Sequence, residues 1–153
     1  MEEERYIARF WDVIENGRQM DESVHDVVDR LTSALISMDA ESVLQWGLLF
    51  DRYHKLAYKG KIWGAANIMD DGFCSDDGVM DSRAGLISQG REVYHAALRN
   101  PDSLAALPKQ NDVRFESVNY VAMTTYEDMT GKDYGDALAN LWLSPEMEKA
   151  IAG

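Results

Sequence analysis

Apolar residues recur along this chain at intervals of three and four positions, which is the spacing of one face of an α-helix. The first apolar stripe consists of Ile7, Phe10, Trp11 and Ile14. This helix should end near Gly17. The second stripe consists of Val24, Val27, Val28, Leu31 and Leu35. Asp21 is its expected N-cap, and Ser23 is the competing choice, because both side chains can accept a hydrogen bond from a free N–H group of the first turn.

The longest predicted helix follows Asp39, which can serve as its N-cap, and should end near Gly60. Its apolar residues leave little polar surface, and they are Val43, Leu44, Trp46, Leu48, Leu49, Phe50, Tyr53 and Leu56. A helix that is apolar on most sides is buried on more than one side. We therefore expect this helix to be the central one.

Two further helices are predicted in the middle of the chain, over about residues 61–70 and 78–89. Leu86 and Ile87 should face inward in the second of them. Gly90 is expected to interrupt the helix before the next apolar stripe. That stripe consists of Val93, Tyr94, Ala97 and Leu98.

The C-terminal third continues the helical pattern. One helix is predicted from the stripe Phe115, Val118, Ala122, Tyr126 and Met129. Gly131 should stop it, and Ser144-Pro145-Glu146 has the order of a cap, a first-turn proline and a first-turn acid. No segment alternates with period two. The sequence thus predicts an all-α fold, a single-domain irregular bundle of about six to eight helices over residues 1–153.

Composition and charge limit the classes of molecule that this protein is expected to bind. The chain has 153 residues, 46% of them apolar, which is enough for a continuous core. Its formal net charge of −12 repels phosphate backbones and anionic membrane surfaces, so we expect neither nucleic acid nor membrane as a ligand, and a basic protein fits better. The N-terminus is acidic, no apolar run is long enough to span a bilayer, and Cys74 is the only cysteine. We therefore expect a cytoplasmic protein.

The acidic turn at residues 70–78 is the most distinctive segment. Its carboxylates belong to Asp70, Asp71, Asp76 and Asp77. These side chains could cap the next helix, pair with Arg83 or Arg91, form a partner-binding surface or hold a divalent cation. Their spacing fails the EF-hand template, because Phe73 and Ser75 occupy the third and fifth ligand positions counted from Asp71. The nearby aspartates also disfavour Cys74 as a nucleophile, since they raise the pKa of a thiol.

Several separated segments between Trp63 and Leu104 resemble a known family. They are Trp63-Gly64-Ala65-Ala66, Cys74-Ser75-Asp76-Asp77-Gly78, Arg83, Leu86-Ile87, Gly90-Arg91-Glu92-Val93-Tyr94 and Asn100-Pro101-Asp102-Ser103-Leu104. Together they are similar to the bacterial family catalogued as domain of unknown function 4240, over about residues 8–131, which leaves a helical extension at about 132–153. One departure is Val79-Met80-Asp81-Ser82, where the family has an aromatic-rich segment. The resemblance implies a mostly helical fold and a bacterial source, and it implies no established activity.

Each histidine has an acid three residues earlier, in the pairs Glu22–His25, Asp51–His54 and Glu92–His95. Two Glu-x-x-His pairs are what carboxylate-bridged di-iron bundles use, but an acidic chain also forms local ion pairs with this spacing. The sequence contains no phosphate-binding glycine loop, no His-Glu-x-x-His and no Cys-x-x-Cys. We therefore assign no catalytic residue, no metal ligand and no cofactor.

Two function hypotheses follow from these observations. The first is a non-enzymatic acidic protein-binding module of the immunity or inhibitor kind, acting on a basic protein partner. The alternative is a small-molecule or divalent-metal sensor or enzyme with a site around residues 63–94. The candidate binding residues are Trp63, Asp70, Asp71, Asp76, Asp77, Arg83 and Arg91. The stripes do not use Tyr120, Tyr134 and Trp142, which could form a binding patch, although the last two could equally pack the C-terminal segment onto the core. The oligomeric state is left open.

Overall fold

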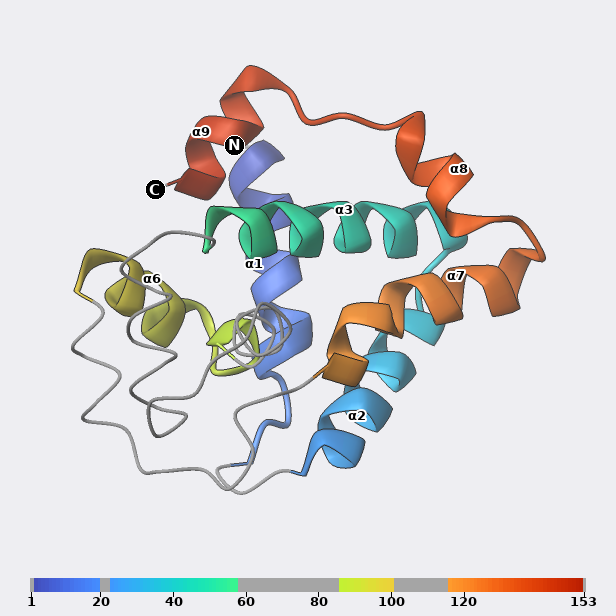
Figure 1. Cartoon of the computed structure of the whole chain (residues 1–153), viewed down its shortest axis with the longest axis horizontal. Helices are drawn as coiled ribbons and strands as arrows, with labels where there is room; N and C mark the ends of the chain where they lie inside the picture. Colours follow the sequence, from blue (N-terminus) through green and yellow to red (C-terminus); the bar gives the residue numbers. More distant parts are fainter. Residues whose placement is uncertain (1, 20–22, 58–85, 101–115, 153) are drawn as a thin grey trace.

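Helices account for all the regular structure in the part of the chain that the computed structural model describes, which is residues 2–19, 23–57, 86–100 and 116–152 (Figure 1). The α-helices are α1 (Glu2–Glu15), α2 (Val24–Ile36), α3 (Ala40–Leu56), α6 (Arg91–Arg99), α7 (Val121–Thr130), α8 (Tyr134–Ala139) and α9 (Pro145–Ala152), and η2 (Glu116–Tyr120) is a 3-10 helix. Residues 86–88 are also helical, and Leu86 and Ile87 are buried as predicted. The all-α prediction is confirmed. None of the described helices is long and apolar enough to span a membrane.

Helix α3 is the centre of the fold, as its apolar composition predicts. α1, α7, α8 and α9 all contact it, and Figure 1 shows it crossing the molecule between them. Its buried residues are Val43, Leu44, Trp46, Gly47, Leu48, Leu49, Phe50 and Tyr53. A helix surrounded in this way gains stability from burial on several sides rather than from one apolar stripe.

A cluster of aromatic side chains joins α1, α3 and α6. Phe10 stacks on Tyr53 with ring centroids 5.0 Å apart, and Trp11 meets the edge of Tyr53 at 4.9 Å. The polar atoms of this buried cluster are paired, because the Trp11 Nε1–H donates to Tyr53 Oη at 3.2 Å and the Tyr94 hydroxyl donates to the Tyr53 carbonyl oxygen at 2.6 Å. The first of these bonds joins α1 to α3, and the second joins α6 to α3.

The N-cap of α2 is Ser23, so Asp21, which was our first choice, was the wrong prediction. The Asp26 N–H donates to Ser23 Oγ at 3.1 Å, and the Ser23 N–H donates to Asp26 Oδ2 at 3.4 Å. This reciprocal capping box needs an acid three residues after the cap. Asp21 itself lies outside the described residues.

The predicted cap of α3 is confirmed, because Asp39 Oδ1 accepts from the Ser42 N–H at 2.7 Å. The same backbone hydrogen bond lowers the pKa of the Asp39 carboxyl. The helix ends at Leu56 with Ala57 as its C-cap, which is earlier than the predicted end near Gly60.

Two predicted stops at glycine are confirmed. Helix α1 ends at Glu15 just before Gly17. Helix α7 ends at Thr130 with Gly131 as its C-cap, and the φ of 71° at Gly131 is the left-handed conformation that glycine adopts without a steric penalty. The carbonyls at the end of α1 are bound by a cation from α2. Arg30 Nη1 donates to the Ile14 oxygen at 2.6 Å and to the Asn16 oxygen at 3.1 Å.

The single helix predicted over 115–129 is instead the 3-10 helix η2 followed by α7. The step of three residues from Phe115 to Val118 fits the three-residue turn of a 3-10 helix as well as it fits an α-helix, so the sequence pattern could not separate the two. Val118, Ala122 and Tyr126 are nevertheless buried as expected.

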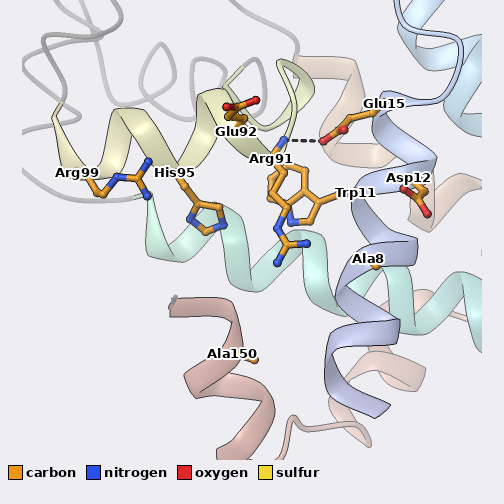
Figure 2. Close-up of a pocket in the computed structure, with 9 residues that line it drawn as sticks. All are labelled: Ala8, Trp11, Asp12, Glu15, Arg91, Glu92, His95, Arg99 and Ala150. Carbon is orange, nitrogen blue, oxygen red and sulfur yellow. Dashed lines mark hydrogen bonds between the residues drawn. The ribbon is translucent and has the colours of Figure 1, made fainter. Parts of the chain in front are cut away.

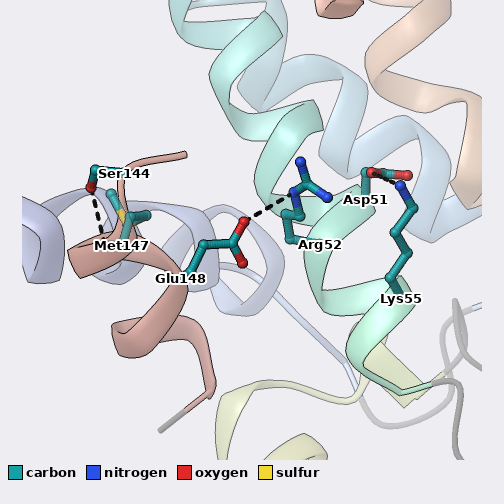
Figure 3. Close-up of polar contacts among 6 residues, drawn as sticks. All are labelled: Asp51, Arg52, Lys55, Ser144, Met147 and Glu148. Atoms are coloured by element: carbon teal, nitrogen blue, oxygen red, sulfur yellow. Dashed lines mark hydrogen bonds and ion pairs between the residues drawn. The ribbon is translucent and has the colours of Figure 1, made fainter. Parts of the chain in front are cut away.

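The C-terminal segment packs onto the core through Tyr134 and α9. The Tyr134 ring lies against Gly47 of α3 and meets the edge of Tyr126 of α7 at a centroid distance of 6.0 Å. Trp142, by contrast, is 78% exposed, so the interpretation that both aromatic residues pack onto the core is correct for Tyr134 and wrong for Trp142. Ser144 caps α9 as predicted, since its Oγ accepts from the Met147 N–H at 3.1 Å (Figure 3).

Candidate functional site

An open cleft lies between α1 and α6, with one wall from α9 (Figure 2). Its volume is about 570 Å³. The residues around it are Ala8, Trp11, Asp12 and Glu15 of α1, Arg91, Glu92, His95 and Arg99 of α6, and Ala150 of α9. Charged side chains therefore dominate the lining, and two alanines leave room between them.

The start of α6 is fixed by a carboxylate from α1. Gly90 precedes the helix with a φ of 108° and has no side chain to act as a cap. Glu15 supplies the missing acceptor, because the Arg91 N–H donates to Glu15 Oε2 at 2.8 Å. A Cβ atom at Gly90 would lie 3.3 Å from that same oxygen, so glycine provides both the backbone conformation and the space.

The cleft side of α6 carries a row of nitrogen-bearing side chains. Arg91, His95 and Arg99 follow one another at intervals of four residues, which puts them on one face of the helix, and Glu92 also lines the cleft. Arg91 Nη2 pairs with Glu4 Oε1 at 3.0 Å. Burial, followed by the positive charges of Arg91 and Arg99, lowers the pKa of His95 below its ordinary value. The lowered pKa favours the neutral imidazole, which can both donate and accept a hydrogen bond.

Helix α9 is held in place as the third wall. Met147 and Ile151 are buried against the core, and Arg52 Nε of α3 lies 3.5 Å from Glu148 Oε1 (Figure 3). Because α9 packs on both α1 and α3, the half-buried Ala150 lies beside the cleft. A short side chain at this position keeps the cleft open.

A second notable surface lies where α2 ends, α3 begins, α7 ends and α8 begins. α8 contacts both α3 and α7, and Figure 1 shows these helix ends on the same side of the molecule. We call this surface the acidic end, and define it by its exposed carboxylates, which are Asp39, Glu41, Asp128, Asp133 and Asp136. The nearby bases are Lys132 in the turn between α7 and α8, and Arg9, which interacts electrostatically with Asp39.

The acidic end also exposes apolar side chains. Ile36, the last residue of α2, is 58% exposed, and Met129 near the end of α7 is 39% exposed. Protein interfaces combine exposed apolar side chains with charged ones, and both kinds are present at the acidic end.

Of the seven candidate binding residues from the sequence, the structure describes Arg91, which lines the cleft. Trp63, Asp70, Asp71, Asp76, Asp77 and Arg83 lie outside the described residues, as does Cys74. The sequence analysis missed Asp12, His95 and Arg99 as lining residues. The four-residue spacing of Arg91, His95 and Arg99 was the signal from which His95 and Arg99 could have been found.

The acid–histidine pairs do not assemble into a metal site within the described residues, where no group of three His, Cys, Asp or Glu side chains is placed to hold a metal ion. His95 and Glu92 both line the cleft, but in Figure 2 their side chains point in different directions from α6. His54 stacks on Phe50 at a centroid distance of 6.2 Å, and His25 is exposed.

Comparison with known proteins gives one family match. The family described as "Protein of unknown function (DUF4240)" matches residues 4–128. The match includes most of α1, all of α2, α3, α6 and η2, and most of α7. No curated protein and no solved structure matches the chain. The cleft thus combines α1 and α6 from the matched region with Ala150 from beyond it.

Proposed function

The chain belongs to the DUF4240 family, and from that premise we propose that it is a non-enzymatic protein-binding module that docks a basic protein partner at its acidic end. The single observation that carries this proposal is that Ile36, Met129 and five carboxylates are all exposed on the helix ends that form the acidic end. A module of this kind would be an inhibitor or immunity protein, which acts by binding its partner and covering the partner's functional surface.

The distribution of bases supports the choice of partner. Several arginines of the described part are engaged inside the molecule, as Arg30 is with the end of α1, Arg52 with Glu148 and Arg91 with Glu4. These arginines therefore do not neutralise the carboxylates of the acidic end. The negative potential at this surface adds to the potential that the net charge of −12 produces around the whole molecule. A field of this kind speeds association with a positively charged surface and repels a negatively charged one.

A bacterial source and a cytoplasmic location are part of the same proposal. The bacterial source rests on the family resemblance, and the location rests on the single cysteine. The proposed partner is therefore a protein of the bacterial cytoplasm.

A pull-down from the native host at low salt tests the proposal. We expect a stoichiometric basic protein with the unmodified chain, and we expect its recovery to fall as salt is raised because screening weakens exposed charge interactions. The double variant Asp128→Asn/Asp136→Asn should lose that protein. The matched variant Asp29→Asn/Glu146→Gln removes the same charge from α2 and α9 and should retain it.

The apolar part of the interface is tested separately with Met129→Ser, which should weaken capture by roughly tenfold, because truncating a central apolar contact costs more than 1 kcal/mol. Failure to recover any stoichiometric protein would contradict the proposal. Equal loss in the two charge variants would also contradict it, because the location of the charge would then be irrelevant.

A further inference from the structure

The cleft between α1 and α6 has unpaired charges of opposite sign at its two ends. Arg91 pairs with Glu4, and Glu15 accepts from the first N–H of α6. Asp12 of α1 and Arg99 of α6 are exposed and form no ion pair with any residue in the described ranges. In Figure 2 they lie at opposite ends of the group of lining residues.

From this arrangement we propose that the cleft binds a small zwitterion, a molecule such as an amino acid or a dipeptide that has a carboxylate at one end and an amino group at the other. The carboxylate would lie beside Arg99 and His95, and the amino group beside Asp12. This site is separate from the acidic end, so the proposal goes beyond the docking of a basic protein.

The α6 side of the cleft has the donors that a carboxylate requires. A guanidinium can hold both oxygens of a carboxylate through two parallel hydrogen bonds, which Arg99 can offer because no described residue occupies it. The neighbouring imidazole of His95 can add a further N–H. In Figure 2 the Arg99 guanidinium extends toward His95, so both groups can reach the same ligand end.

The α1 side has the acceptor that an amino group requires. The carboxylate of Asp12 is exposed and one turn from Glu15, whose own carboxylate is already bound to the start of α6. In Figure 2, Trp11 and Arg91 lie between His95 and Asp12, and Ala8 and Ala150 also line the cleft with only methyl groups. The middle of the ligand would therefore lie beside the Trp11 ring and the Arg91 side chain, which already pairs with Glu4.

The overall charge of the protein separates a zwitterion from the competing ligands. A simple anion would be attracted by Arg99 but repelled by the net charge of −12, and a simple cation would have no need of the α6 side. A zwitterion has no net charge, so the net negative charge of the protein does not repel it. Its carboxylate and its amino group are still attracted by Arg99 and Asp12. The cleft lining, with two arginines and three carboxylates, is close to balanced as well.

Calorimetric titration of the full chain with matched small molecules tests this inference. The zwitterionic probes are glycine, diglycine and 6-aminohexanoate, which differ in the distance between their charges. The controls are propionate and inorganic phosphate as anions and propylamine as a cation. We expect at least one zwitterion to bind roughly tenfold more tightly than every control, the value of one additional charge-assisted hydrogen bond. Equal binding of an anion, or no binding by any zwitterion, would overturn the proposal.

Two variants locate the binding to the two ends of the cleft. Arg99→Gln and Asp12→Asn should each raise the dissociation constant of the preferred zwitterion roughly tenfold. Arg5→Gln and Asp29→Asn remove exposed charges of the same signs that do not line the cleft, and they should leave the constant unchanged. If the controls weaken binding as much as the cleft variants do, the ligand is bound elsewhere and the proposal is wrong.

The imidazole of His95 provides a spectroscopic signature of the bound pose. A carboxylate placed beside it offsets the two arginines, so NMR titration should show the pKa of His95 rising when the ligand is bound. His25 lies on α2 and does not line the cleft, so its NMR signals should stay in place when the ligand is added. The acidic-end variant Asp128→Asn/Asp136→Asn should bind the zwitterion normally, which separates failure of this inference from failure of the protein-docking proposal.

Discussion

Replacing Gly47 with alanine measures how closely the C-terminal segment approaches the central helix. Gly47 is buried in α3 beneath the Tyr134 ring. A Cβ atom at this position would lie 2.9 Å from the Ala122 Cβ atom of α7 and would also collide with the Tyr134 hydroxyl. Real Cβ atoms do not approach one another so closely, so α3, α7 or the tyrosine must move.

The expected cost is the difference between two opposing effects. Alanine is favoured over glycine within a helix by about 1 kcal/mol. Overpacking a buried contact costs about 1–3 kcal/mol, and the upper end applies here because the Ala122 Cβ atom is attached directly to the backbone and cannot rotate away. We therefore expect Gly47→Ala to lower the free energy of unfolding by about 2 kcal/mol, which corresponds to a fall in melting temperature of roughly 4–8 °C.

Urea unfolding followed by circular dichroism measures this change, and a double-mutant cycle identifies its cause. In the Tyr134→Ala background one of the two collisions is absent, so Gly47→Ala should cost less there than in the natural chain. The reasoning is refuted if Gly47→Ala increases stability, as it would on an exposed helix. It is also refuted if the cost is the same in both backgrounds.

Three further changes are expected to have measurable effects. Tyr53→Phe removes the oxygen that accepts the Trp11 Nε1–H in the core, and urea unfolding should show a loss of about 1–2 kcal/mol because the indole N–H is left unpaired. Arg30→Lys should cost about 1 kcal/mol by the same assay, because a single ammonium cannot reproduce the guanidinium contacts to the Ile14 and neighbouring carbonyls. His95 has a lowered pKa in the folded state, so the unfolded chain binds the proton first and stability falls as the pH drops below the ordinary value of 6.5. His95→Gln should therefore reduce the stability lost between pH 7.5 and pH 5.5.

The tyrosine and arginine changes have matched controls on the surface. Tyr120→Phe and Arg5→Lys alter exposed side chains and should change stability by less than about 0.5 kcal/mol. An effect of the control equal to that of the test variant would show that the cited contact is not the cause.

The sequence was most informative where the physics is local. A helix stripe, a cap and a glycine stop each depend on residues within a few positions, which is why the helix containing Trp11, the cap at Asp39 and the stop at Gly131 could be predicted. The choice between Asp21 and Ser23 failed because two good caps were close together, and the reciprocal bond to Asp26 decided between them.

The candidate site was only partly accessible to the same reasoning. Arg91 was named from the sequence, and the four-residue spacing to His95 and Arg99 could have been read from it. What the spacing could not supply was the opposite wall, because Asp12 is far from α6 in the sequence and reaches the cleft only through the packing of α1.

The sequence by itself therefore determined that this protein is a helical bundle with an apolar central helix and a strong negative charge, since those properties follow from local periodicity and from composition. Only the tertiary structure decided which charges face one another. Arg91 pairs with Glu4, and Tyr134 packs on Gly47. Asp12 and Arg99 line the same cleft from different helices. In each case the two residues are distant along the chain. Such pairings depend on how the helices pack together, and a pattern that repeats every three or four residues does not specify them.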